Sequence, residues 1–115
     1  MSNKKKVLFI CNQNRLRSPT AEKLYCNCEN IETKSAGINK DALNQLTSEL
    51  LEWADIIFVF EKRQRNIIHK RFKEIYSRKQ IICLYIPDDY EYMEPTLIEL
   101  LKEKLKPYIG LPNNI

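Results

Sequence analysis

Residues 5–22, KKVLFICNQNRLRSPTAE, decide the fold that we expect for this chain. The apolar run 7–10 is typical of a buried strand, and a loop follows over 11–17. A helix is expected to open at Ser18 and Pro19, because proline is favoured in a first helical turn. Loop amides that precede a helix point into a common hollow, where the helix dipole adds partial positive charge. The stretch therefore predicts a binding site for a phosphate-sized anion.

Two residues of this loop carry chemistry. Cys11 would lie at the floor of the hollow, where the positive field favours the thiolate, the nucleophilic form of cysteine. Arg17 supplies a planar fork for two oxygens of a phosphoryl group. A nucleophilic cysteine together with an arginine that binds phosphate is typical of a cysteine-dependent phosphatase. The alternative is that Cys11 is a small buried residue ending a strand and Arg17 a solvated residue at a helix start.

The loop has no glycine to supply a positive φ. The chain has only two glycines, Gly37 and Gly110, and both lie outside it. Asparagine tolerates the left-handed region better than most residues, so Asn12 and Asn14 are the candidates. We expect Asn14 to be the left-handed residue and to be held by hydroxyls such as that of Ser18.

This loop resembles the phosphate loop of the low-molecular-weight protein tyrosine phosphatases. In both, a cysteine and an arginine are separated by five residues, and here Ser-Pro-Thr-Ala-Glu follows. The resemblance implies that Cys11 is the nucleophile and that Asn14 stabilises the loop. It also implies that Arg17 clamps the phosphate and that the Ser18 hydroxyl supports the leaving thiolate. A phosphate or sulfate ion is expected in the loop, with no metal and no cofactor. The other residues that we assign to substrate binding there are Asn12, Gln13, Arg15 and Leu16.

Two loop positions depart from that family. Leu16 stands where many members carry a second cysteine, so a disulfide that protects an oxidised Cys11 is not expected. Arg15 adds a positive charge where we expect the mouth of the cleft. It would favour substrates with acidic flanks.

The stretch 87–92, PDDYEY, is the second candidate for chemistry, because it follows a predicted strand over 80–86. A carboxylic acid there can protonate a leaving phenolate, and Tyr90 can flank an aromatic substrate. The resembled family has Asp-Pro-Tyr in a late loop of this kind, whereas here proline precedes the two acids. Asp88 or Asp89 is the expected general acid. The alternative is that both are turn residues.

The resemblance extends to the middle of the chain. A predicted strand over 31–36 contains Ser35, and in the family a serine at this position braces the phosphate loop; an ordinary strand exit fits Ser35 equally well. A helix is predicted over 42–54, with a possible internal restart at Thr47 and with Trp53 in the core. It leads into an apolar run over 56–60 that is typical of a central parallel strand.

Basic residues dominate the segment 61–79, where apolar residues keep a helical spacing. We predict one helix with a solvated basic face, and the alternative is a docking patch for an acidic partner or nucleic acid. His69 is expected at the surface or half-buried. An amphipathic helix over 96–108 completes the chain.

The alternation of strands and helices predicts an α/β fold, a three-layer sandwich with a four-stranded parallel sheet. Strand order 2-1-3-4 is expected, partly by resemblance, with the phosphate loop after strand 1 at the switch point of the sheet. The length of 115 residues predicts one low-molecular-weight tyrosine-phosphatase-like domain over 1–115.

Composition further narrows the class of protein to which the chain can belong. A net charge of +4 suits an enzyme that attracts anions better than it suits a nucleic-acid binder. The longest plain apolar run, 56–60, is far too short to cross a membrane. The four cysteines have no metal-site spacing, and reduced thiols point to a reducing compartment, so we expect a cytoplasmic protein.

We therefore expect a protein tyrosine phosphatase that hydrolyses phosphotyrosine or other aryl phosphate monoesters through a phosphocysteine intermediate. Its partners would be phosphotyrosine proteins or small aryl phosphates, and neither a membrane nor nucleic acid. One alternative is an arsenate reductase-like enzyme on the same fold, for which Cys83 is the candidate resolving cysteine outside the first helix. The other is a non-catalytic phosphate-binding or basic interaction module that uses residues 61–79.

Overall fold

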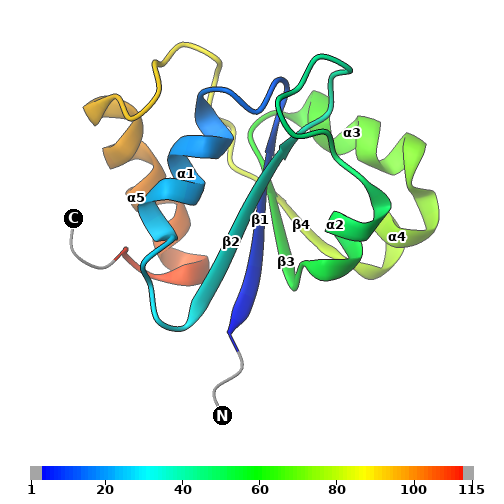
Figure 1. Cartoon of the computed structure of the whole chain (residues 1–115), viewed down its shortest axis with the longest axis horizontal. Coiled ribbons are helices and arrows are strands. Elements are labelled where there is room, and N and C mark those ends of the chain that lie inside the picture. Colours follow the sequence, from blue (N-terminus) through cyan, green and yellow to red (C-terminus); the bar gives the residue numbers. More distant parts are fainter. Residues whose placement is uncertain (1–3, 113–115) are drawn as a thin grey trace.

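One parallel sheet forms the middle layer of the molecule, which a computed structural model describes for residues 4–112 (Figure 1). Its strands lie in the order β2-β1-β3-β4, so the predicted α/β class and strand order are confirmed. Figure 1 shows α1 and α5 on one face of the sheet and α2, α3 and α4 on the other. None of the helices within the described range is long and apolar enough to cross a membrane. The strands are β1 (Lys5–Cys11), β2 (Ile31–Gly37), β3 (Ile56–Val59) and β4 (Gln80–Cys83), and the helices are α1 (Arg17–Tyr25), α2 (Ser48–Trp53), α3 (Lys62–Arg71), α4 (Lys73–Arg78) and α5 (Pro95–Ile109).

The central strand β1 divides the core into two parts. Successive side chains of a strand point to opposite faces of the sheet. Val7 and Phe9 therefore pack with the apolar sides of α1 and α5, while Leu8 and Ile10 pack with α2 and α3. Because helices cover both faces, every side chain from residue 7 to residue 10 is fully buried, as the unbroken apolar run predicts.

The predicted helix over 42–54 is shorter in the structure. It begins only at Ser48, where Thr47 Oγ1 accepts a hydrogen bond of 3.2 Å from the backbone N–H of Leu50. Most of the residues before Thr47 form a loop, in which the Leu43 N–H donates to the Gln13 carbonyl at 3.1 Å. The Asn44 carbonyl and the Leu46 N–H instead pair with Gly37 at the end of β2, at 2.8 and 2.9 Å, and this pairing takes the segment out of a helix.

The predicted single helix over 61–79 is interrupted at Phe72, whose backbone has φ −130° and ψ 53°. The break lets Ile68 of α3 and Ile75 of α4 both reach the core part that contains Leu8. A hydrophobic spacing on its own does not reveal such a bend, because both halves keep the helical period.

The predicted strand over 80–86 is also shorter, because β4 ends at Cys83. Tyr85 has a left-handed backbone, with φ at 56°. The backbone N–H groups of Leu84 and Ile86 nevertheless bond to the carbonyls of Val59 and Phe60, at 2.8 and 2.9 Å. The segment therefore continues alongside the end of β3 and leads to the candidate acids.

Two predictions for single aromatic residues are confirmed. Trp53 is half-buried against the core part that contains Leu8, and the Lys34 ammonium lies 4.5 Å from the centre of its ring. His69 is exposed and stacks on Tyr76, with 4.4 Å between the ring centres.

Candidate active site

A small hollow lies at the end of β1, where the chain turns into α1. Cys11 is the last residue of β1 and is almost completely buried, and Arg17 is the first residue of α1. In Figure 1 the connection from β4 to α5 passes over the same end of the sheet. The fold therefore brings together loop and acid residues that are far apart in sequence. The residues that line the hollow are Cys11, Asn12, Gln13, Arg15, Leu16, Arg17 and Asp88.

The loop contains the left-handed residue that its sequence predicts. Asn14 has φ at 58° and is buried. Its side-chain Nδ2 donates to the hydroxyls of Ser18 and Ser35, each at 2.9 Å, so it ties the loop to α1 and to β2. Within the described range, no backbone N–H of residues 12–16 donates to a backbone carbonyl. These donors are therefore available to an anion in the hollow.

The Cys11 sulfur lies 2.9 Å from the Ser18 hydroxyl oxygen. That oxygen accepts a hydrogen bond from Asn14, so its own proton can be donated either to the sulfur or to the Ala36 carbonyl, which lies 3.5 Å away. A donated hydroxyl proton stabilises a thiolate. The chain of contacts continues through Ser35, whose hydroxyl donates to Glu22 Oε1 at 2.5 Å.

The Arg17 guanidinium is held from several sides. The side chain is only 2% exposed, and its Nη1 donates to Glu61 Oε2 at 2.6 Å and to the Ile86 carbonyl at 2.9 Å. Its Nε lies 3.7 Å from Asp88 Oδ1. A buried charge without partners would be costly, so these contacts fix the direction in which the guanidinium points.

Sequence reasoning missed Glu61 and Gln64, which brace this site from the start of α3. Gln64 is completely buried, and its Oε1 accepts from the backbone N–H groups of Phe60 and Glu61 at 2.7 and 2.9 Å. Its Nε2 donates to Asn12 Oδ1 at 3.1 Å. Glu61 and Gln64 form a capping box, and an acid followed three residues later by glutamine is the sequence signal that could have identified it.

Gly37, the last residue of β2, is a further residue that the sequence did not assign to the site. A Cβ atom there would lie 2.6 Å from the Asn12 carbonyl oxygen and 2.9 Å from the Asn14 nitrogen. These distances are shorter than any normal contact of a Cβ atom. The loop therefore packs directly on the backbone of β2, which requires glycine at this position.

The two candidate acids occupy different places. Asp88, whose side chain is 55% exposed, borders the hollow, whereas Asp89 borders an adjoining groove of about 470 Å³. Asn12 and Asp88 border both spaces, so Asp88 stands where the hollow opens into the groove. The groove is lined by Asn12, Phe60, Glu61, Lys62, Tyr85, Ile86, Pro87, Asp88 and Asp89.

The other predicted site residues take varied positions. Arg15 and Gln13 are exposed at the edge of the hollow, and Gln13 Nε2 donates to Asp41 Oδ2 at 3.1 Å. Leu16 is half-buried there. Tyr90 is also half-buried, but it packs against the core part that contains Phe9.

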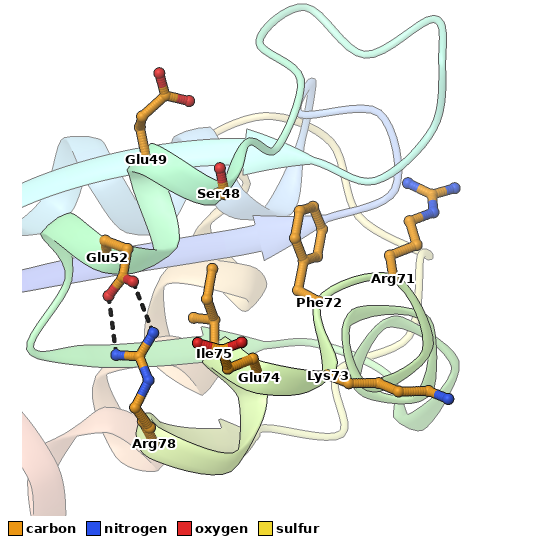
Figure 2. A pocket seen from close by; sticks show the side chains of 9 residues that line it. All are labelled: Ser48, Glu49, Glu52, Arg71, Phe72, Lys73, Glu74, Ile75 and Arg78. Atoms are coloured by element: carbon orange, nitrogen blue, oxygen red, sulfur yellow. Dashed lines mark hydrogen bonds and ion pairs between the residues drawn. The ribbon is translucent and has the colours of Figure 1, made fainter.

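A larger cavity of about 580 Å³ lies elsewhere, where α2 faces α4 and the end of α3 (Figure 2). Figure 2 shows Glu52 and Arg78 joined across it by two hydrogen bonds, of 2.7 and 3.2 Å. The hydrogen bond from Arg78 lowers the pKa of the exposed Glu52 carboxyl. None of the predicted site residues lines this cavity.

Known proteins resemble this chain in structure but not in sequence. No protein-family model and no curated protein sequence matches the chain. The tyrosine phosphatase Wzb from Escherichia coli K30, in complex with phosphate, has a TM-score of 0.75 at 21% identity and covers 90% of this chain and 95% of its own. SP-PTP, a low-molecular-weight protein tyrosine phosphatase from Streptococcus pyogenes, has a TM-score of 0.74 at 16% identity, covering 91% and 93%.

A third neighbour, the YwlE arginine phosphatase from Geobacillus stearothermophilus, has a TM-score of 0.66 at 23% identity and covers 90% of this chain and 94% of its own. All three matches extend over nearly the whole of both chains. The protein therefore has the fold of the low-molecular-weight protein tyrosine phosphatases, as the resemblance of its first loop implies.

Proposed function

We propose that this protein is a cysteine-dependent phosphatase that hydrolyses phosphotyrosine or other aryl phosphate monoesters. The observation that carries the proposal is the grouping of the Cys11 sulfur, the Ser18 hydroxyl and the buried Arg17 at one hollow. Phosphatases named for tyrosine share its fold, which supports the same reaction class. The left-handed Asn14 supports it further, because such a residue gives a loop an anion-binding curve.

In the first step the Cys11 thiolate attacks phosphorus, and the bond between phosphorus and the leaving oxygen breaks. The loop N–H groups and the Arg17 guanidinium bind the equatorial oxygens, where negative charge gathers. Asp88 donates its proton to the leaving oxygen, which departs as a phenol. The Ser18 hydroxyl gives up its bond to sulfur as the thiophosphate forms.

In the second step water attacks the phosphorus atom of the phosphocysteine. The Asp88 carboxylate takes a proton from this water, and the bond between sulfur and phosphorus breaks. Inorganic phosphate leaves, and the Ser18 hydroxyl again donates to the Cys11 thiolate. Asp88 is thereby protonated for the next turnover.

An aryl phosphate assay in the presence of a chelator tests the proposal. We expect wild-type turnover and a loss of at least about 10⁴-fold in kcat for Cys11→Ser, because a serine hydroxyl in this hollow is not ionised. Cys26→Ser, at an exposed position outside the hollow, is the matched control and should retain full activity. Turnover that survives in Cys11→Ser would rule out this mechanism.

The two alternatives receive less support. Reduction of arsenate needs a resolving cysteine near Cys11, but Cys83 packs on the opposite face of the sheet, in the core part that contains Leu8. A binding module would use the basic residues of α3 and α4. It would not require the bond between Ser18 and the Cys11 sulfur.

The substrate class is best tested with a panel of phosphorylated compounds. Phosphotyrosine peptides and small aryl phosphates should be the best substrates, and phosphoarginine belongs in the panel because one neighbour of this fold is an arginine phosphatase. A nucleophilic Cys11 must stay reduced, so we also propose that the protein works in the cytoplasm.

A further inference from the structure

Tyr85 has an unusual backbone for a bulky residue. Its φ of 56° lies in the left-handed region, which an aromatic residue rarely adopts. Its side chain is also exposed, at 60% of its full area. Strain of this kind persists only where the surrounding structure enforces it, and it gathers at functional sites.

The residues on either side of Tyr85 explain its left-handed backbone, but they do not explain why an aromatic side chain stands there. Leu84 and Ile86 are buried, and their N–H groups bond to the carbonyls of Val59 and Phe60 at the end of β3. With both neighbours held inward, residue 85 must bulge outward. Glycine or asparagine would adopt this conformation with less strain, so the packing of the segment does not call for tyrosine.

Tyr85 lies next to the candidate active site. It is one of the residues that line the groove of about 470 Å³ that adjoins the hollow. Asn12 and Asp88 border both spaces, so the leaving group of a phosphoryl group bound beside Cys11 can extend past Asp88 into this groove.

We propose that Tyr85 is a specificity-determining residue that stacks on the aromatic ring of the leaving group. The inference rests on the proposed function. It assigns to Tyr85 the contact with an aromatic substrate that the sequence suggested for Tyr90, which packs against the core instead. A phenol ring offers a large face to stack on and costs little conformational freedom.

The substitution Tyr85→Asn separates the ring from the backbone, because asparagine accepts a left-handed φ. We expect kcat/KM for a phosphotyrosine peptide to fall about tenfold, the upper end of what one aromatic pair contributes. The inhibition constant of inorganic phosphate should not change, because the hollow stays intact. Tyr85→Phe keeps the ring and should stay within about twofold of wild type.

Two further variants make the result decisive. Tyr85→Gly is a second variant without a ring, and its thermal unfolding checks that the segment is still folded. Tyr92→Asn removes an aromatic side chain, 49% exposed, from the same segment but outside the groove, and it should retain wild-type kcat/KM.

The outcomes separate this inference from the proposed function. If wild type shows no turnover that depends on Cys11, the proposed function fails. If that turnover exists and Tyr85→Asn matches wild type, only the role of Tyr85 is overturned. An equal loss of peptide turnover and of phosphate inhibition would also overturn it, because the ring would then act on the loop and not on the leaving group.

Discussion

The contact between the phosphate loop and Gly37 leaves no room for a methyl group. In Gly37→Ala the new Cβ would meet Asn12 and Asn14 at less than 3 Å, so the loop must move. We expect a loss of stability of about 1–3 kcal/mol, typical of overpacking, together with a clear loss of phosphate binding. Urea unfolding and calorimetric titration with inorganic phosphate measure the two effects.

The other glycine provides the control. Gly110 ends α5 with φ at 75°, and nothing lies within 4 Å of a Cβ built there. Gly110→Ala should cost about 1–3 kcal/mol, because φ 75° with ψ −167° is a conformation that almost only glycine adopts, and should leave phosphate binding unchanged. Equal phosphate affinity in the two variants would contradict the role assigned to Gly37.

Because the two candidate acids occupy different places, we expect different results when each is replaced by its amide. Asp88→Asn should lower kcat about 10²-fold or more on substrates with a poor leaving group, because proton donation is lost. The loss should shrink with a leaving group that departs readily as an anion. Asp89→Asn should stay within about threefold of wild type, because Asp89 borders only the groove. The reverse ranking would make Asp89 the general acid.

The first turn of α3 acts as a brace for the phosphate loop. In Gln64→Leu the buried N–H of Phe60 and the part-buried N–H of Glu61 lose their acceptor, and Asn12 keeps only the hydrogen bond from Arg63. Unpaired buried groups cost about 1–3 kcal/mol each, so we expect lower stability. Phosphate inhibition should also weaken, because Asn12 at the start of the loop is then held by Arg63 alone.

The hydrogen bond that caps the start of α2 provides a matched control. Thr47→Ala removes the cap on the Leu50 N–H and should cost about 0.5–2 kcal/mol. Thr47 does not line the hollow, so its loss should leave the phosphate inhibition constant unchanged. A Gln64→Leu variant that is destabilised but inhibited normally would reduce Gln64 to a structural role.

One hydroxyl group joins the end of α1 to the end of α5. Tyr25, at the end of α1, donates to the Gly110 carbonyl at 2.8 Å. Burial, with a smaller contribution from Cys28, raises the pKa of Tyr25 from 10.0 to about 12. The folded state thus favours the neutral phenol. Its stabilising effect is complete below pH 10 and is lost as the pH rises towards 12.

Tyr25→Phe tests this coupling. The variant should be less stable at neutral pH by about 1 kcal/mol, the usual net contribution of a hydrogen bond. Between pH 10 and 12 it should lose less stability than wild type, because it lacks the titrating group. Urea unfolding of both proteins across this pH range gives the difference between their free energies of unfolding. The titration of other groups cancels in this difference. Parallel curves for the two proteins would exclude a raised pKa for Tyr25.

The sequence alone determined the architecture and the centre of the loop. The unbroken apolar runs 7–10 and 56–60 are typical of strands in a sheet covered on both faces, and the lack of loop glycine leaves asparagine to supply the positive φ. These features depend on residues that are close together in the chain, so local physical chemistry suffices to predict them.

Only the tertiary structure decided which distant residues complete the site. Glu61 and Gln64 look like part of a basic surface helix, and their role arises because β3 ends beside β1. The different positions of Asp88 and Asp89, the outward turn of Tyr85 and the close packing of Gly37 also depend on how the strand ends meet. Such contacts join segments 20 to 70 residues apart, such as Arg17 and Ile86. Their geometry is set by packing of the whole sheet, which no local pattern encodes.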